Sequence, residues 1–181
     1  ITDIARDDFG KIAGVTQSGS YGGGTLGFTR SFTFDAHQRP CRRIDPESGS
    51  TVWGYDAASR LAWEAQGQSG SGCLASAPAG ATLFTYDVRG RPLFIDHPGT
   101  ADDVSRGYDL AGNETSVINA VASWSYSYNK RNLLEREQVQ VDWTKDGHAV
   151  SRVVRAYDPR PGAFTVQRGL DVKLYGVRVA M

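Results

Sequence analysis

The sequence of 181 residues lacks any long hydrophobic run and has no net charge. A helix that crosses a bilayer needs about 20 predominantly apolar residues, so no transmembrane helix is expected. The 20 Lys and Arg residues balance the 20 Asp and Glu residues, which leaves no net field to attract nucleic acid or an anionic membrane. We therefore expect neither a membrane span nor a nucleic-acid partner.

Cysteine and histidine are scarce as well, with two and three copies. Cys41 and Cys73 can pair, but two cysteines form neither a disulfide framework nor a metal-ligand spacing, so a disulfide and free thiols both remain open. No histidine has a second His or a Cys at ligand spacing. No Gly-x-Ser-x-Gly nucleophile motif is present. We expect no metal, no cofactor and no catalytic residue.

The sequence does contain short alternating segments that predict strands. In one of them Phe84 and Tyr86 stand two residues apart, the period that points both rings to one face of a strand. Asp87 then opens a four-residue turn that ends at Gly90, where a left-handed residue can form the bulge that rejoins the two strands. After the turn, apolar residues alternate again. Since no window has the period of a long helix, an all-β fold of antiparallel hairpins is predicted.

This turn motif recurs along the chain at steps of 20 to 31 residues. Such repetition is typical of hairpins that stack into one sheet, because each of them alone is only marginally stable. We expect the edges of this sheet to allow self-association. The seven copies are RDDFGKI at Arg6, FDAHQRP at Phe34, YDAASRL at Tyr55, YDVRGRP at Tyr86, YDLAGNE at Tyr108, YNKRNLL at Tyr128 and YDPRPGA at Tyr157.

Two positions of the motif allow finer predictions. The fifth is glycine in three copies, whereas Gln38 and Ser59 there predict either a strained residue or another turn type. The sixth is a cation in four copies, which we expect to fold back over the aspartate of its own turn. These four are Lys11, Arg39, Arg60 and Arg91.

The Tyr-Asp-x-x-Gly-Arg series resembles the YD repeats of the RHS (rearrangement hot spot) family, which includes the C components of insecticidal Tc toxins and the teneurins. The resemblance implies a spiralling β-sheet that forms part of a shell around a C-terminal toxin or cargo polypeptide. It further implies an exported bacterial protein, secreted or at the cell surface. On this hypothesis the chain is a structural piece of a longer protein.

The last residues resemble the end of the RHS core, which gives two predicted regions, a repeat segment at 1–150 and a C-terminal element at 151–181. In that family, aspartates near this end carry out autoproteolysis. Asp158 and Asp171 are the candidates here, but the expected Asp-Pro pair falls on Arg168-Gly169. A cation at that position keeps neighbouring carboxylates ionised, which argues against cleavage and against an enzyme.

A second alternative is a carbohydrate-binding or cell-surface adhesion module. Trp124, Tyr126 and Tyr128 alternate along one strand and would place three rings on one face. If that face is exposed, it can bind a glycan. If it is packed, the rings belong to the inner face of the sheet, where aromatic pairs are common.

Overall fold

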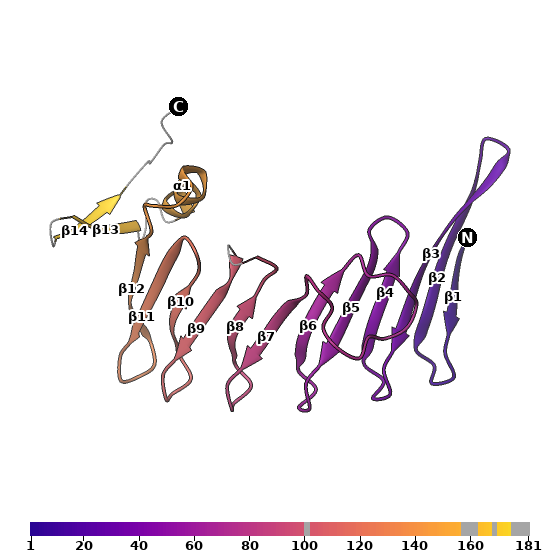
Figure 1. Cartoon of the computed structure of the whole chain (residues 1–181), viewed down its shortest axis with the longest axis horizontal. Helices are drawn as coiled ribbons and strands as arrows, with labels where there is room; N and C mark the ends of the chain where they lie inside the picture. The colour runs from indigo at the N-terminus through magenta and orange to yellow at the C-terminus, as the bar shows by residue number, and fades with distance from the viewer. Residues whose placement is uncertain (100–101, 157–162, 168–169, 175–181) are drawn as a thin grey trace. The chain divides into compact units, whose positions relative to one another are not determined.

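A computed structural model describes residues 1–99, 102–156, 163–167 and 170–174. It confirms the all-β prediction, because the described chain consists of strands and turns with a single α-helix (Figure 1). The chain divides into two compact units, Ile1–Phe84 and Thr85–Met181. No helix of the described residues has the length and hydropathy that a membrane crossing requires.

The first unit is an antiparallel sheet in which each strand pairs with the next one along the chain. This order follows from hairpins joined in sequence, since short turns can connect only antiparallel neighbours. Figure 1 shows the strands side by side. They are β1 (Thr2–Arg6), β2 (Ile12–Tyr21), β3 (Gly24–Phe34), β4 (Pro40–Asp45), β5 (Gly49–Tyr55), β6 (Leu61–Gln66) and β7 (Thr82–Tyr86), whose last two residues belong to the second unit.

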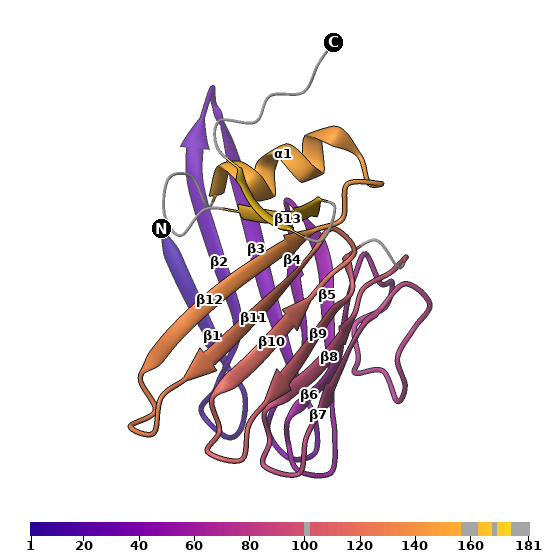
Figure 2. The same cartoon turned by 90° about the vertical axis from the view of Figure 1, so that its left-hand side faces the viewer.

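The second unit begins with hairpins of the same kind and then changes. Its strands are β8 (Pro92–Asp96), β9 (Val104–Tyr108), β10 (Glu114–Ile118), β11 (Ala122–Tyr128) and β12 (Leu134–Val141). The helix α1 (Gly147–Ala156) follows, then β13 (Ala163–Gln167) and β14 (Leu170–Leu174). Because the connection through α1 is a crossover, β13 pairs in parallel with β12, where Gln140 lies opposite Phe164 (Figure 2).

The recurring motif forms the same turn in all six copies that lie in the described residues. In the first, the N–H of Asp7 donates to the carbonyl of Lys11 at 2.9 Å, and the N–H of Gly10 donates to the carbonyl of Asp7 at 2.9 Å. The side-chain oxygen of the turn residue also accepts from the backbone, as Asp87 Oδ1 does from the N–H of Arg91 at 2.9 Å. The hairpin prediction is therefore confirmed. The seventh copy, at Tyr157, falls outside the described residues.

The fifth motif position has positive φ in every described copy, whatever residue occupies it. Gln38 and Ser59 both have φ of 63°, beside 80° for Gly10, and they make the same backbone hydrogen bonds. The alternative of a different turn type is therefore wrong for these two copies. The Asp side chain and the ladder hydrogen bonds hold a non-glycine residue in the left-handed region.

The sixth position folds over the turn aspartate in three of the four expected copies. Arg39 Nε lies 2.7 Å from Asp35 Oδ2, and its guanidinium stacks on the ring of Tyr55 in the next copy. The prediction is wrong for Lys11, whose ammonium group donates to the carbonyl of Gln38 in the neighbouring turn. An amide can replace the cation, since Asn113 Nδ2 donates to Asp109 Oδ2 at 2.8 Å.

A long loop between β6 and β7 covers one face of the first unit (Figure 1). Arg42, which is 1% exposed, donates to the carbonyls of Gly72 at 2.7 Å and Gln68 at 2.9 Å, and to the hydroxyl of Ser50 at 2.6 Å. Cys41 and Cys73 form a disulfide, with their Cα atoms 5.3 Å apart, which settles the open question of their pairing. The loop is thus held by a buried guanidinium and a covalent bond.

In the second unit the helix α1 covers β11 and β12. The sequence analysis did not predict this helix. Asp146 caps its start, because Asp146 Oδ2 accepts from the N–H of Ala149 at 2.9 Å. Val150 and Val154, one turn apart, are 4% and 0% exposed. They pack into a core with Ala122, Val139 and Val141 of β11 and β12. This burial, about 1.5–3 kcal/mol per fully buried valine, fixes the helix on the sheet.

Candidate functional site

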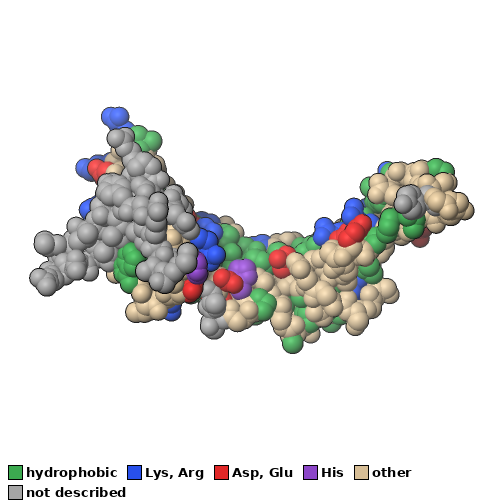
Figure 3. All heavy atoms as spheres, turned by 90° about the horizontal axis from the view of Figure 1, so that it is seen from above, with side chains coloured by type: hydrophobic (Ala, Val, Ile, Leu, Met, Phe, Trp, Pro, Cys, Tyr) green, Lys and Arg blue, Asp and Glu red, His purple; other side chains and the backbone are tan. Residues whose placement is uncertain are grey.

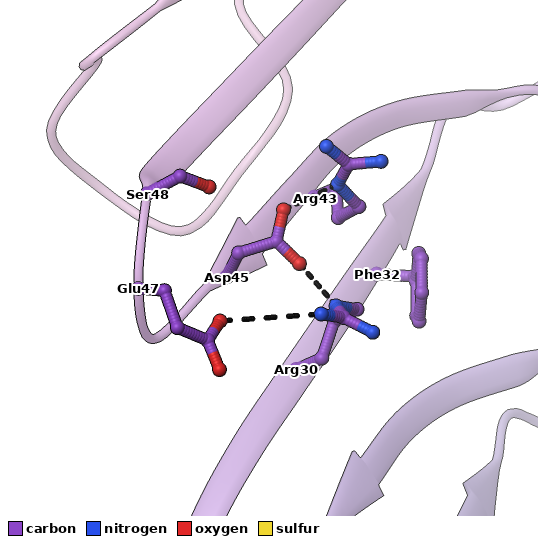
Figure 4. A pocket seen from close by; sticks show the side chains of 6 residues that line it. All are labelled: Arg30, Phe32, Arg43, Asp45, Glu47 and Ser48. Carbon is purple, nitrogen blue, oxygen red and sulfur yellow. Dashed lines mark hydrogen bonds and ion pairs between the residues drawn. The ribbon is translucent and has the colours of Figure 1, made fainter.

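Two pockets of the described chain bring an aspartate next to an aromatic side chain. The first, of about 500 Å³, lies in the first unit on β3 and β4 and on the turn that follows β4. Figure 4 shows Arg30 and Asp45 pointing toward each other, with Phe32 beside Arg30. On this part of the surface, basic and acidic side chains gather next to one another (Figure 3). The lining residues are Arg30, Phe32, Arg43, Asp45, Glu47 and Ser48.

Strand register explains why these side chains meet. Phe32 lies opposite Arg43 in the β3–β4 pair, and side chains two residues apart on a strand share one face. Arg30 and Phe32 on β3 therefore line the same face as Arg43 and Asp45 on β4. No single segment of the sequence carries this set, so the one-dimensional pattern did not reveal the pocket.

Asp45 is the charged centre of this pocket, with only 6% of its side chain exposed. Arg30 Nε donates to Asp45 Oδ1, and Arg43 Nε lies 2.6 Å from Asp45 Oδ2. Burial alone raises the pKa of this carboxyl, but the hydrogen bond from Arg30 and the charges of Arg43 and Arg30 outweigh burial and lower it. The carboxylate is ionised at neutral pH and orients both guanidinium groups.

The second pocket, of about 540 Å³, lies in the second unit, where β12 ends. Asp142 Oδ1 accepts from the N–H of Thr144 at 3.0 Å and from its hydroxyl at 2.7 Å, while Lys145 Nζ lies 3.7 Å from Asp142 Oδ2. These hydrogen bonds from Thr144 are the largest cause that lowers the pKa of Asp142. They fix the turn that carries Trp143, which is 43% exposed and lines the pocket.

Exposed charged side chains continue from this turn along α1. Lys145, His148 and Arg152 are exposed, while Val150, Ser151 and Val154 on the other side of the helix are buried. His148 and Arg152 stand four residues apart and therefore lie on one helix face. We name the four residues Trp143, Lys145, His148 and Arg152 the helix surface. Lys145 and Arg152 offer cations and Trp143 an exposed indole, beside the exposed carboxylates of Asp142 and Asp146. Cations next to an aromatic ring are what a polyanion that carries aromatic rings contacts.

The aromatic strip proposed for glycan binding lies on the packed side of its strand. Trp124, Tyr126 and Tyr128 are half-buried, whereas the alternating Ser125 and Ser127 are exposed. Trp124 packs against the core under α1, and the hydroxyl of Tyr128 donates to the carbonyl of Glu114 at 2.8 Å. The three rings share one face, as predicted, but that face forms no open platform.

The other candidates for chemistry give no assembled site. Asp158 and the Arg168-Gly169 pair lie outside the described residues, and for Asp171 only the backbone of β14 is described. Within the described ranges, no three His, Cys, Asp or Glu side chains are placed to hold a metal ion.

Comparison with known protein families gives a match at the C-terminal end of the chain. Residues 133–181 match the family model described as formyl transferase, C-terminal domain. This segment contains β12 and the helix surface, together with β13 and β14.

Curated relatives agree with this match. Methionyl-tRNA formyltransferase of Roseiflexus sp. (strain RS-1) is 45% identical over 47 residues, which are 26% of this chain and 14% of the relative. The enzyme of Thermotoga maritima is 42% identical over 45 residues, 25% of this chain and 14% of the relative. That of Nitrosomonas europaea is 37% identical over 46 residues, again 25% and 14%. The chain thus covers about one seventh of these relatives.

The fold has likenesses among solved structures. The crystal structure of TcdB2-TccC3-TEV aligns with a TM-score of 0.55 and 14% identity, over 76% of this chain and 8% of that chain. The structure of TcdB2-TccC3-Cdc42 gives the same score and identity over 76% and 7%. At this identity the likeness concerns the fold alone.

These findings correct several predictions that rested on the RHS resemblance. The RHS resemblance predicted the fold correctly. The assignment of the chain to the RHS family is wrong, since the matching family model is that of formyl transferases. The toxin-shell function and its glycan-binding and autoproteolytic alternatives are corrected by the same match. So are the toxin or cargo partner, the cell-surface partner and the secreted location. The exclusion of nucleic acid is not supported by this match either, since the printed name of the relatives contains methionyl-tRNA.

Proposed function

We propose that residues 133–181 form an accessory segment of the formyl transferase type that contacts methionyl-tRNA. The observation that carries this proposal is the match of that segment to the C-terminal domain model, with methionyl-tRNA formyltransferases up to 45% identical. Within the described chain, the helix surface is the part of this segment best suited to contact RNA. We propose further that the hairpin sheet supports the segment, through the core that α1 shares with β11 and β12.

Charge distribution supports an RNA contact better than net charge does. Residues 133–181 contain eight Lys and Arg against six Asp and Glu, whereas residues 1–132 contain twelve against fourteen. The neutral chain is therefore the sum of an acidic sheet and a basic end. Lys145 and Arg152 can neutralise phosphates, and the indole of Trp143 offers a stacking partner to an unpaired base.

The division of the chain belongs to the same proposal. A boundary at residue 150 falls inside α1, which spans Gly147–Ala156. Since the family model begins at residue 133, the repeat segment and the C-terminal element share β12 and its core. The predicted regions 1–150 and 151–181 therefore stay a proposal for the extent of the repeat segment and the C-terminal element, whereas the proposed RNA-contacting segment, 133–181, overlaps both.

The test measures tRNA binding by the full chain. The readout is the fluorescence anisotropy of labelled initiator methionine tRNA at several salt concentrations. We expect binding that weakens as salt rises. The double variant Lys145→Ala/Arg152→Ala removes two phosphate contacts, so the slope of log affinity against log salt should fall by about two.

A matched control is the double variant Arg89→Ala/Lys130→Ala, which removes two cations from the second unit outside the matched segment. It should leave the salt slope unchanged. Absence of tRNA binding at low salt contradicts the proposed function. An equal loss in both double variants contradicts the assignment to the helix surface and indicates a non-specific charge effect.

A further inference from the structure

The charged pocket of the first unit holds two guanidinium groups beside a single buried acid. Arg30 and Arg43 share Asp45, and within the described residues Arg43 has no other acidic partner. Glu47 approaches Arg30 only at 4.0 Å with 67% of its side chain exposed, a geometry that contributes little. Arg30 and Arg43 are 47% and 41% exposed, so solvent and ligands reach both guanidinium groups.

An apolar groove begins where this pocket ends. It measures about 520 Å³ and lies over β2 and β3, and Phe32 lines both cavities. Its lining is mostly apolar, from Ile12, Val15, Phe32, Phe34 and Pro40, and it also includes Lys11 and Gln38. Ile12 is 37% exposed, so part of this apolar surface faces water. Contact with a ligand of similar polarity would remove that surface from water.

From this juxtaposition we propose that the first unit binds a small carboxylate with an apolar body, its head on Arg43 and Arg30 and its body over Phe32 in the groove. Arginine forms paired hydrogen bonds with the two oxygens of a carboxylate. Asp45 holds both guanidinium groups in place before the ligand arrives, which lowers the entropy lost on binding. Nothing in this inference depends on the tRNA proposal, because the site lies in the other unit.

The two halves of the site exclude other ligands. Inorganic phosphate satisfies the arginines but leaves the groove wet. A neutral aryl alcohol fills the groove but brings no carboxylate to the exposed parts of the two guanidinium groups. Ligands that combine both features should bind more tightly than either alone, because the two contributions occur in one molecule.

The experiment measures binding of 4-phenylbutyrate to the full chain by isothermal titration calorimetry, in parallel with 4-phenylbutanol and with inorganic phosphate. We expect the acid to bind about tenfold more tightly than either comparison compound. Arg43→Lys keeps a positive charge beside Asp45 but loses the planar fork, and we expect it to weaken binding of the acid about fivefold. Phe32→Leu keeps the site apolar but removes the ring, and a smaller loss is expected.

The matched control is Arg6→Ala, which removes an exposed arginine of the same unit outside both cavities and should leave the affinity unchanged. Thermal unfolding of each variant by circular dichroism shows whether it is folded. If Arg43→Lys does not fold, Phe32→Leu still tests the proposal. Equal affinity for acid and alcohol overturns the proposal, as does phosphate binding as tight as that of the acid. An unchanged affinity in both pocket variants also overturns it.

Discussion

The first and second units cover their sheets in different ways. In the first unit a loop without regular structure covers the strands, and it is held by the buried Arg42 and by the Cys41–Cys73 disulfide. In the second unit α1 covers β11 and β12 through Val150 and Val154. A hairpin sheet must bury one face, and this chain does so once with polar and covalent tethers and once with hydrophobic packing. The comparison predicts that one substitution can detach α1 from its strands and that a different one can release the loop between β6 and β7.

The largest effect is expected from Val154→Asp in α1. Val154 is 0% exposed, and an aspartate there places an unpaired carboxylate in the core with Val139 and Val141. The free energy of unfolding should fall by about 4 kcal/mol or more, as the helix leaves the sheet. Urea denaturation measures this loss.

A control in the same helix is Arg152→Gln, at an exposed position, for which a change within about 0.5 kcal/mol is expected. If the two substitutions destabilise equally, or if Val154→Asp leaves stability unchanged, α1 does not depend on hydrophobic packing and the comparison fails.

A smaller effect is expected from removal of the disulfide by Cys41→Ser/Cys73→Ser. The bond links residues 32 positions apart, and such a bond contributes about 3 kcal/mol by restricting the unfolded chain. Cleavage by a protease should increase in residues 67–81 and not in α1. Limited proteolysis with mass spectrometry locates the cuts.

Dithiothreitol gives the control for this variant. It should reproduce the effect in the wild type and add nothing to the double substitution, because the described chain contains no free cysteine. Cuts that appear equally in α1 would indicate that the two covers are not independent.

The smallest loss of stability per residue is expected at acid pH. This loss should be similar in the two units. Asp56 in the first unit and Asp87 in the second have pKa values lowered below 3.8, chiefly by backbone hydrogen bonds from Arg60 and Arg91. A group whose pKa is depressed in the folded state stabilises the fold above its unfolded pKa and loses that contribution as pH falls through the folded value. Stability should therefore decline below about pH 4.

The variant Asp87→Asn checks this assignment, since an amide keeps the turn acceptor without the titration. Its urea midpoint should depend less on pH below about 4 than that of the wild type. An identical pH profile for wild type and variant would assign the acid sensitivity to other groups.

Sequence patterns predicted the hairpin sheet because its signals are local. The aspartate and the fifth and sixth residues of each motif meet within one turn, as Asp35 and Arg39 do. Gln38 and Ser59 were misjudged as a possible change of turn because side-chain preference alone favours glycine where φ is positive. There the hydrogen bonds of the aspartate outweigh that preference.

The helix and the charged pocket were missed for two different reasons. For α1 a signal existed, since Asp146 is a cap and Val150 and Val154 stand at helical spacing, but the element is only ten residues long among strands. For the pocket no local signal exists, because Arg30 and Asp45 meet only through the register of β3 and β4. Net charge did not reveal the basic segment at residues 133–181, because it sums an acidic and a basic region.

The sixth residue of one turn contacts the aromatic residue of the next turn, and this contact repeats along the sheet. Within the first unit Arg39 reaches Tyr55 and Ser59, and within the second Arg91 reaches Tyr108. Each of these contacts thus links a hairpin to its immediate neighbour. Duplication or deletion of a hairpin that carries neither the Cys41–Cys73 disulfide nor the core under α1 would preserve these turn-to-turn contacts, so the repeated part can change length without redesign of its junctions.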